Sequence, residues 1–100
     1  MIARTWHGAV PKKIGDAYFE YVKETGISDY RKIQGNLGIL VLRRNDKYKT
    51  HFLLISLWDS FDSIKEFAGD DYTKARYYED DKLFLSDFEP VFHHEVLIKE

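Results

Sequence analysis

The pattern of apolar and polar positions along the chain predicts six elements of secondary structure, in the order β-α-β-β-α-β. Strands are expected over residues 2–9, 37–44, 48–58 and 91–99, and helices over residues 12–25 and 61–68. This order is typical of a ferredoxin-like α+β fold, in which an antiparallel sheet carries both helices on one face. We therefore expect residues 1–100 to form a single domain of this type.

Both helices are expected from apolar stripes with helical spacing and from residues that favour helix ends. In the first helix, an apolar residue recurs every three or four positions between Ile14 and Val22, and Gly26 is a typical stop. In the second helix, Asp59 and Ser60 are typical cap residues and Gly69 is a typical stop. Residues 27–36 are expected to form a loop, because "GN" is a turn signal.

The strand "HFLLISLW" is apolar on both faces, since only Ser56 is polar between Phe52 and Trp58. Alternation places Leu53, Ile55 and Leu57 on one face, and Phe52, Leu54 and Trp58 on the other. Two helices can cover only one face, and the other would leave an apolar patch that is unusual for a monomer. We expect a second copy to cover it by sheet-to-sheet packing in a homodimer. The alternative is that residues 72–88 fold across this face within one chain; the role of residues 79–89 stays open.

The composition is that of a globular protein, with 44% apolar and 32% charged residues and a formal net charge of −2. This charge gives no general attraction to nucleic acid or to an anionic membrane. The chain has no cysteine, which excludes disulfides and thiolate metal sites. No apolar run approaches membrane-spanning length, and the first ten residues lack the pattern of a signal peptide, so a cytoplasmic location is expected.

Several stretches of the chain together resemble the antibiotic biosynthesis monooxygenase-like superfamily of dimeric α+β barrels, especially its small stand-alone bacterial members. They are "MIARTWHGAVP", "LRR", "FLLISLWDSFDSIKEFAG", "DDYTKARYYEDD" and "HHEVL". The resemblance implies a homodimer whose sheets form a barrel, with a cavity in each subunit. The relatives differ in what they do. Some oxidise aromatic polyketides with molecular oxygen and without a metal or organic cofactor, others degrade haem, and others bind small molecules or have no known activity.

The residues that carry activity in such relatives match this chain only in part. The cofactor-free monooxygenases have an asparagine four residues before the tryptophan of the third strand. Here that tryptophan is Trp58, but the earlier position is Leu54. Haem-degrading relatives use positions that correspond here to Trp6, Phe67 and Tyr77, and all three residues differ. The resemblance therefore favours oxygenase or binding function over haem degradation.

Candidate site residues follow from strand alternation and side-chain chemistry. Arg4 and Trp6 share one face of the first strand. There the Arg4 guanidinium could bind a carboxylate or an enolate, with the flat indole ring of Trp6 beside the ligand. The indole N–H of Trp58 could bind a substrate oxygen, and Tyr72 and Leu54 could line the cavity. The alternatives are structural: an interface salt bridge for Arg4, core packing for the tryptophans, and an aromatic lid for Tyr72.

The four histidines offer acid–base chemistry rather than a metal site. His93 and His94 are adjacent on the last strand, so they point to opposite faces. We take His94 as the candidate general base, because imidazole titrates near neutrality. His51 begins the third strand, where it can pair across the hairpin. No metal-ligand spacing is found, and no metal or cofactor is expected.

The sequence thus supports two hypotheses. The first is a cofactor-independent oxygenase that acts on a small aromatic or enolisable molecule. Its catalytic residues would be His94, Trp58 and Arg4, and its substrate-binding residues Trp6, Tyr72 and Leu54. The second is a non-catalytic dimer that binds a small hydrophobic or aromatic molecule. Turnover of an oxidisable aromatic compound distinguishes them.

Overall fold

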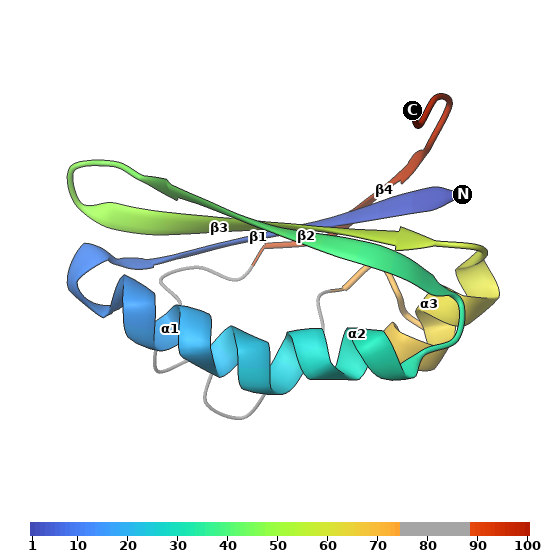
Figure 1. Cartoon of the computed structure of the whole chain (residues 1–100), viewed down its shortest axis with the longest axis horizontal. Coiled ribbons are helices and arrows are strands. Elements are labelled where there is room, and N and C mark those ends of the chain that lie inside the picture. The colour runs from blue at the N-terminus through green and yellow to red at the C-terminus, as the bar shows by residue number, and fades with distance from the viewer. Residues whose placement is uncertain (75–88) are drawn as a thin grey trace.

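A computed structural model describes residues 1–74 and 89–100 of the chain (Figure 1). The elements are β1 (Ile2–Pro11), η1 (Lys12–Ile14), α1 (Gly15–Val22), η2 (Lys23–Ile27), α2 (Ser28–Lys32), β2 (Asn36–Asn45), β3 (Lys49–Trp58), α3 (Phe61–Ala68) and β4 (Phe92–Glu95). The strands form one antiparallel sheet in the order β2-β3-β1-β4, with the helices on one face. The predicted ferredoxin-like α+β fold is confirmed.

The first helical region is longer than predicted. It does not stop at Gly26 but continues through a π-helical segment, η2, directly into α2 (Figure 1). Gly26 and Ile27 are buried within it, and Tyr30 beyond them is 4% exposed. A glycine costs a helix about 1 kcal/mol, which burial of a large apolar side chain outweighs. Residues 28–32, predicted as loop, are therefore helical because Tyr30 extends the buried stripe.

The second predicted helix has the expected bounds. In α3, the side chain of Ser60 accepts a hydrogen bond from the backbone N–H of Ser63. Gly69 ends the helix with a φ of 87°, a left-handed conformation that glycine adopts without strain. A second glycine, Gly35, lies so close to the side chains of Ser63 and Asp59 that a Cβ atom would collide with them. This contact fixes the start of α3 against the turn before β2.

The two faces of the sheet differ in cover. Phe52, Leu54 and Trp58 of β3 point to the helix-covered face and are 0%, 5% and 0% exposed. The opposite face, which we call the open face, carries exposed apolar side chains on three strands: Leu40 and Leu42 on β2, Leu53 on β3 and Phe92 on β4. The predicted split of β3 into two apolar faces is thus confirmed, and no described element covers the open face (Figure 1).

The last part of the chain departs from the prediction in length. β4 covers only Phe92–Glu95, because it pairs with the first residues of β1 and its last ladder partner is Ile2. Most of residues 72–88, the alternative cover for the open face, lies outside the described residues. The described part, Tyr72–Lys74, contacts the helix-covered side, where the Lys74 carbonyl accepts a hydrogen bond from Arg4. Among the described helices, none has the length and apolar character needed to span a membrane.

Candidate functional site

Arg4 is a buried charged residue on the helix-covered face. It is the third residue of β1, lies opposite Ser56 of β3 and is 2% exposed. Its guanidinium donates from Nη1 to the Tyr30 hydroxyl at 3.4 Å and from Nη2 to the Lys74 carbonyl at 3.2 Å, and it lies 5.5 Å from the centre of the Phe67 ring. Its Nε is buried without a hydrogen-bond partner. The guanidinium is therefore held in place but incompletely satisfied.

No carboxylate among the described residues pairs with the Arg4 guanidinium. Burial lowers the pKa of Arg4, while the negative potential of the Tyr30 hydroxyl and its hydrogen bond oppose that effect. An arginine stays protonated in proteins, so the positive charge buried here has no counter-ion among residues 1–74 and 89–100. Buried charges are normally paired, and an anionic ligand would supply the missing partner.

His93 is the cross-strand neighbour of Arg4 on the same face. In the β1–β4 ladder Arg4 lies opposite His93, and Ala3 lies opposite His94. The Nε2 atom of His93 is buried and has no hydrogen-bond partner. The pKa of His93 is lowered, first by burial, then by the positive charge of Arg4 and by His94. At neutral pH its ring is neutral, so one of its two nitrogens carries no proton and can accept one.

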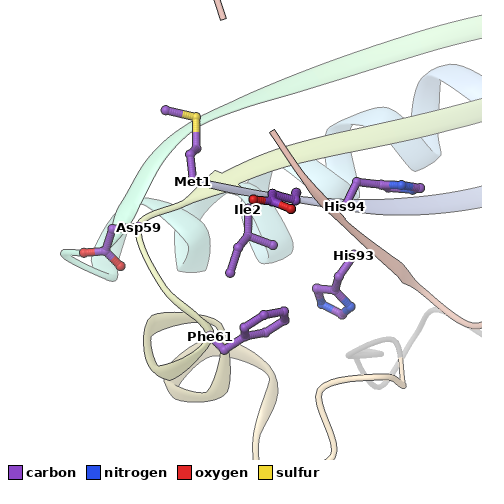
Figure 2. Close-up of a pocket in the computed structure, with 7 residues that line it drawn as sticks. Met1, Ile2, Asp59, Phe61, His93 and His94 are labelled. Atoms are coloured by element: carbon purple, nitrogen blue, oxygen red, sulfur yellow. The ribbon is translucent and has the colours of Figure 1, made fainter. Parts of the chain in front are cut away.

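Aromatic side chains and a hollow complete this site. The His93 ring centre lies 5.2 Å from that of Tyr72 and 5.8 Å from that of Phe61, and these two rings are 5.3 Å apart. Beside them is a hollow of about 370 Å³, lined by Met1, Ile2, Asp59, Phe61, His93, His94 and Glu95. Figure 2 shows that His93, Phe61 and Ile2 lie on the same side of β4. We call Arg4, His93, Tyr72 and Phe61 the Arg4 site.

The predicted site residues fall into two groups in space. Arg4, Trp6, Leu54 and Trp58 all belong to the helix-covered face. Trp58 packs 5.9 Å from both the Tyr30 and the Phe67 rings, and its indole N–H donates to Ser56 Oγ at 2.8 Å. Its donor is thus used inside the protein. Tyr72 lies apart from them, edge-on to the His93 ring at 5.2 Å, and it is not among the residues that line the hollow.

His94 is not brought together with Arg4 and Trp58. It pairs with Ala3, so its ring lies on the open face and points away from His93 and Phe61 (Figure 2). Sequence reasoning placed the two histidines on opposite faces, but it could not decide which one shares the face of Arg4. That choice depends on the register between β1 and β4, which a shift of one residue reverses. The sequence did not identify His93 and Phe61 as site residues, nor Tyr30, which contacts Arg4.

The arrangement can bind and polarise a small anion. Arg4 offers positive charge, His93 offers a proton acceptor, and Tyr72 and Phe61 offer flat apolar walls. Within the described part of the chain, no three His, Asp or Glu side chains are grouped so that they could hold a metal ion. The Arg4 guanidinium and the neighbouring aromatic rings therefore support binding of an organic anion.

Known proteins resemble this chain in structure but not measurably in sequence families. No protein-family model and no curated protein matches the sequence. A solved Bacillus cereus protein, described as a candidate antibiotic biosynthesis monooxygenase, is 14% identical with a TM-score of 0.63 over 99% of this chain and 95% of its own. A solved variant of MhuD with two manganese protoporphyrin IX molecules per active site is 15% identical. Its TM-score is 0.66, and the match covers 100% of this chain and 98% of the MhuD chain. The chain therefore has the fold of the antibiotic biosynthesis monooxygenase-like proteins, as its sequence predicted.

Proposed function

We propose that the protein is a cofactor-independent oxygenase that binds a small, enolisable aromatic molecule at the Arg4 site. The observation that carries this proposal is the buried Arg4 guanidinium, which has no carboxylate partner in the described part of the chain, next to the buried Nε2 of His93, which has no hydrogen-bond partner there. A guanidinium stabilises a developing oxyanion, and a neutral imidazole removes the proton that creates it. Similarity in fold to a protein described as a candidate monooxygenase supports this choice.

The proposed reaction starts with proton transfer to His93 Nε2 from an acidic C–H or O–H group of the substrate. The negative charge moves onto a substrate oxygen, which Arg4 binds in place of the missing counter-ion. The resulting electron-rich carbanion transfers one electron to dioxygen, and the two radicals combine into a peroxide. Burial of Arg4 strengthens this electrostatic contribution, because charges interact more strongly where water is excluded.

Oxygen uptake with anthrones, quinols and flavonols tests the proposal. The wild-type protein should consume dioxygen with at least one of these compounds, and Arg4→Met and His93→Gln should each lower kcat/KM by about 100-fold or more. His94→Gln is the matched comparison, because the sequence favoured His94 as the base. Loss of turnover in His94→Gln with full activity in His93→Gln would reject the assignment of His93. The assignments of Trp58, Trp6 and Leu54 stay predictions for the same assay.

A second candidate function is binding without turnover. It is favoured by Trp58, whose N–H is already bound to Ser56, so that Arg4 is the main donor left for a substrate oxygen. Native mass spectrometry of the purified protein distinguishes the two functions. A retained anion that is returned unchanged after incubation in air supports binding alone, and an oxygenated product supports the enzyme.

Haem degradation is a third and weaker candidate. It is suggested by the similarity in fold to a MhuD variant that holds manganese protoporphyrin IX. The positions that such relatives use are Trp6 and Phe67 here, both buried in the core, and Tyr77, which lies outside the described residues. A haem titration without a shift of the Soret band would reject this candidate.

We also propose that the open face packs against a second copy of the chain. Leu40, Leu42 and Leu53 are exposed apolar residues on the neighbouring strands β2 and β3, and Phe92 is exposed on β4 at the other edge of the same face; solvent-exposed sheets seldom carry such a surface. Sedimentation velocity at micromolar concentration should give a particle of twice 11.9 kDa. A folded monomer at that concentration would contradict the dimer. The cytoplasmic location stays a prediction, which fractionation of cells can test.

A further inference from the structure

Four polar side chains form a continuous hydrogen-bonded network near the open face, away from the Arg4 site. His7 Nδ1 lies 2.7 Å from Glu89 Oε2, and His51 Nε2 lies 2.8 Å from Asp46 Oδ2. Between them, His7 Nε2 and His51 Nδ1 are 3.0 Å apart. This network thus joins the β2–β3 turn, β3, β1 and the segment that leads into β4.

At one end of this network, the hydrogen-bond acceptor is Asp46 and the donor is His51. Asp46 Oδ1 accepts the backbone N–H groups of Tyr48 at 2.8 Å and Lys49 at 2.6 Å. The hydrogen bond from His51, followed by those of Lys49 and Tyr48, holds the pKa of Asp46 far below its usual range. An ionised carboxylate can only accept, so His51 Nε2 must carry a proton. His51 Nδ1 then has no proton if the ring is neutral.

The other end repeats this arrangement. At neutral pH the carboxylate of Glu89 also accepts, so the donor in its contact is His7 Nδ1. His7 Nε2 then has no proton if that ring is neutral. Two neutral rings would therefore bring two bare nitrogens to 3.0 Å, lone pair against lone pair. Such a contact is repulsive unless a cation lies between the nitrogens.

The orientation of the rings identifies this cation as a proton. The ring planes are inclined by only 20°, and their centres are 5.2 Å apart. This separation exceeds the nitrogen–nitrogen distance by about twice the distance from a ring centre to its nitrogen. The two nitrogens therefore lie close to the line between the centres, edge to edge. A metal ion on that line would need the nitrogens about 4 Å apart, because each Zn–N bond is about 2 Å.

We propose that Asp46, His51, His7 and Glu89 form a proton-bridged clamp, in which the two imidazoles together hold three ring protons at neutral pH. One proton points to each carboxylate, and the third is shared between His7 Nε2 and His51 Nδ1. The pair carries one positive charge between two negative ones, and the hydrogen bonds that result are charge-assisted. The clamp ties the β2–β3 turn to β1 and to the segment before β4.

Other charged residues near the clamp do not replace its members. Arg44 lies opposite His51 in the β2–β3 ladder, and Lys49 lies two residues before His51 on the same face. Neither side chain donates a hydrogen bond to the clamp among the described contacts. The side chains of His7 and His51 are 33% and 16% exposed, so the shared proton can exchange with solvent.

Nitrogen-15 NMR of the histidine rings at neutral pH tests the clamp in the full chain. We expect protons on His7 Nδ1 and His51 Nε2, and one further, strongly downfield proton coupled to His7 Nε2 and His51 Nδ1. Two neutral rings, each with a single proton, would overturn the proposal. So would stoichiometric binding of Zn²⁺ that shifts both inner nitrogens, because a metal would then occupy the position assigned to the proton.

Two variants and a matched control extend this test. Glu89→Gln and Asp46→Asn each remove a charge that holds the shared proton, and both should lose the downfield signal. They should also raise amide hydrogen exchange at the β2–β3 turn by about tenfold, the usual effect of losing a hydrogen bond to a charged group. Glu66→Gln changes an exposed glutamate on α3 and should keep the signal and the exchange rates. Equal behaviour of all three variants would contradict the clamp.

Discussion

The two faces of the sheet are unusual in opposite respects: one buries a charged residue, and the other exposes apolar residues. The helix-covered face is packed with aromatic side chains such as Trp58 and Phe52, yet it buries an arginine without a carboxylate partner among the described residues. The open face exposes leucines, yet two of its histidines, His7 and His51, are hydrogen-bonded at both ring nitrogens. The face that is covered by its own helices is thus electrostatically incomplete, whereas the exposed face lacks only apolar cover. This difference is the reason for proposing ligand binding at the first face and association at the second.

The largest expected effect comes from truncating adjacent residues on the two faces. Phe52 is fully buried against the Tyr18 and Phe19 rings, so Phe52→Ala should lower the free energy of unfolding by about 3–5 kcal/mol. Leu53 is 36% exposed in the single chain, and Leu53→Ala should cost under about 1.5 kcal/mol in dilute protein. Urea unfolding at several protein concentrations measures both. Equal losses in dilute protein would show that the two faces are equally covered within one chain.

The next effect concerns the buried charge. If Arg4 is kept for a ligand, Arg4→Met removes an unpaired charge and should raise the free energy of unfolding by about 1–2 kcal/mol without ligand. The same variant should lose the stabilisation that an aromatic carboxylate or enolate gives to the wild-type protein. Thermal unfolding with and without such a compound measures both changes. A destabilised Arg4→Met protein would instead assign Arg4 a structural role.

Association through the open face should respond to charge at one exposed position. Leu40 is 56% exposed on β2, and Leu40→Lys would bring two like charges into the apolar contact of a dimer. We expect dimer dissociation constants to rise by about 100-fold, with little change in monomer stability, because a surface substitution usually changes it by less than about 0.5 kcal/mol. Glu66→Lys on α3 is the control. Unchanged sedimentation of Leu40→Lys would exclude this face as the interface.

Most helices and strands can be predicted from local sequence patterns, whereas the residues that meet at the Arg4 site depend on contacts between distant parts of the chain. Alternation in β3 and the cap at Ser60 are set by neighbouring residues, so they can be predicted from the sequence. The continuation of the helix past Gly26 depends on burial of Tyr30 against Trp58 and Phe67, which are distant in sequence. The face of His93 likewise depends on long-range register. Arg4 could be identified as a candidate, but its missing counter-ion is visible only in three dimensions.

The smallest expected effect tests the neutrality of His93. Burial, the charge of Arg4 and His94 lower its pKa from the ordinary value of 6.5, so the unfolded chain takes up a proton at this ring at a higher pH than the folded chain does. Below about pH 6.5 the unfolded state therefore binds more protons, and the free energy of unfolding falls as the pH falls, until the folded pKa is reached. His93→Gln has no proton to take up and should show a smaller decline between roughly pH 7 and pH 5. Urea unfolding of both proteins across this range measures the difference. If both proteins lose stability in parallel, His93 has the same proton affinity folded and unfolded, and the helix-covered face does not hold the neutral base that the proposed reaction needs.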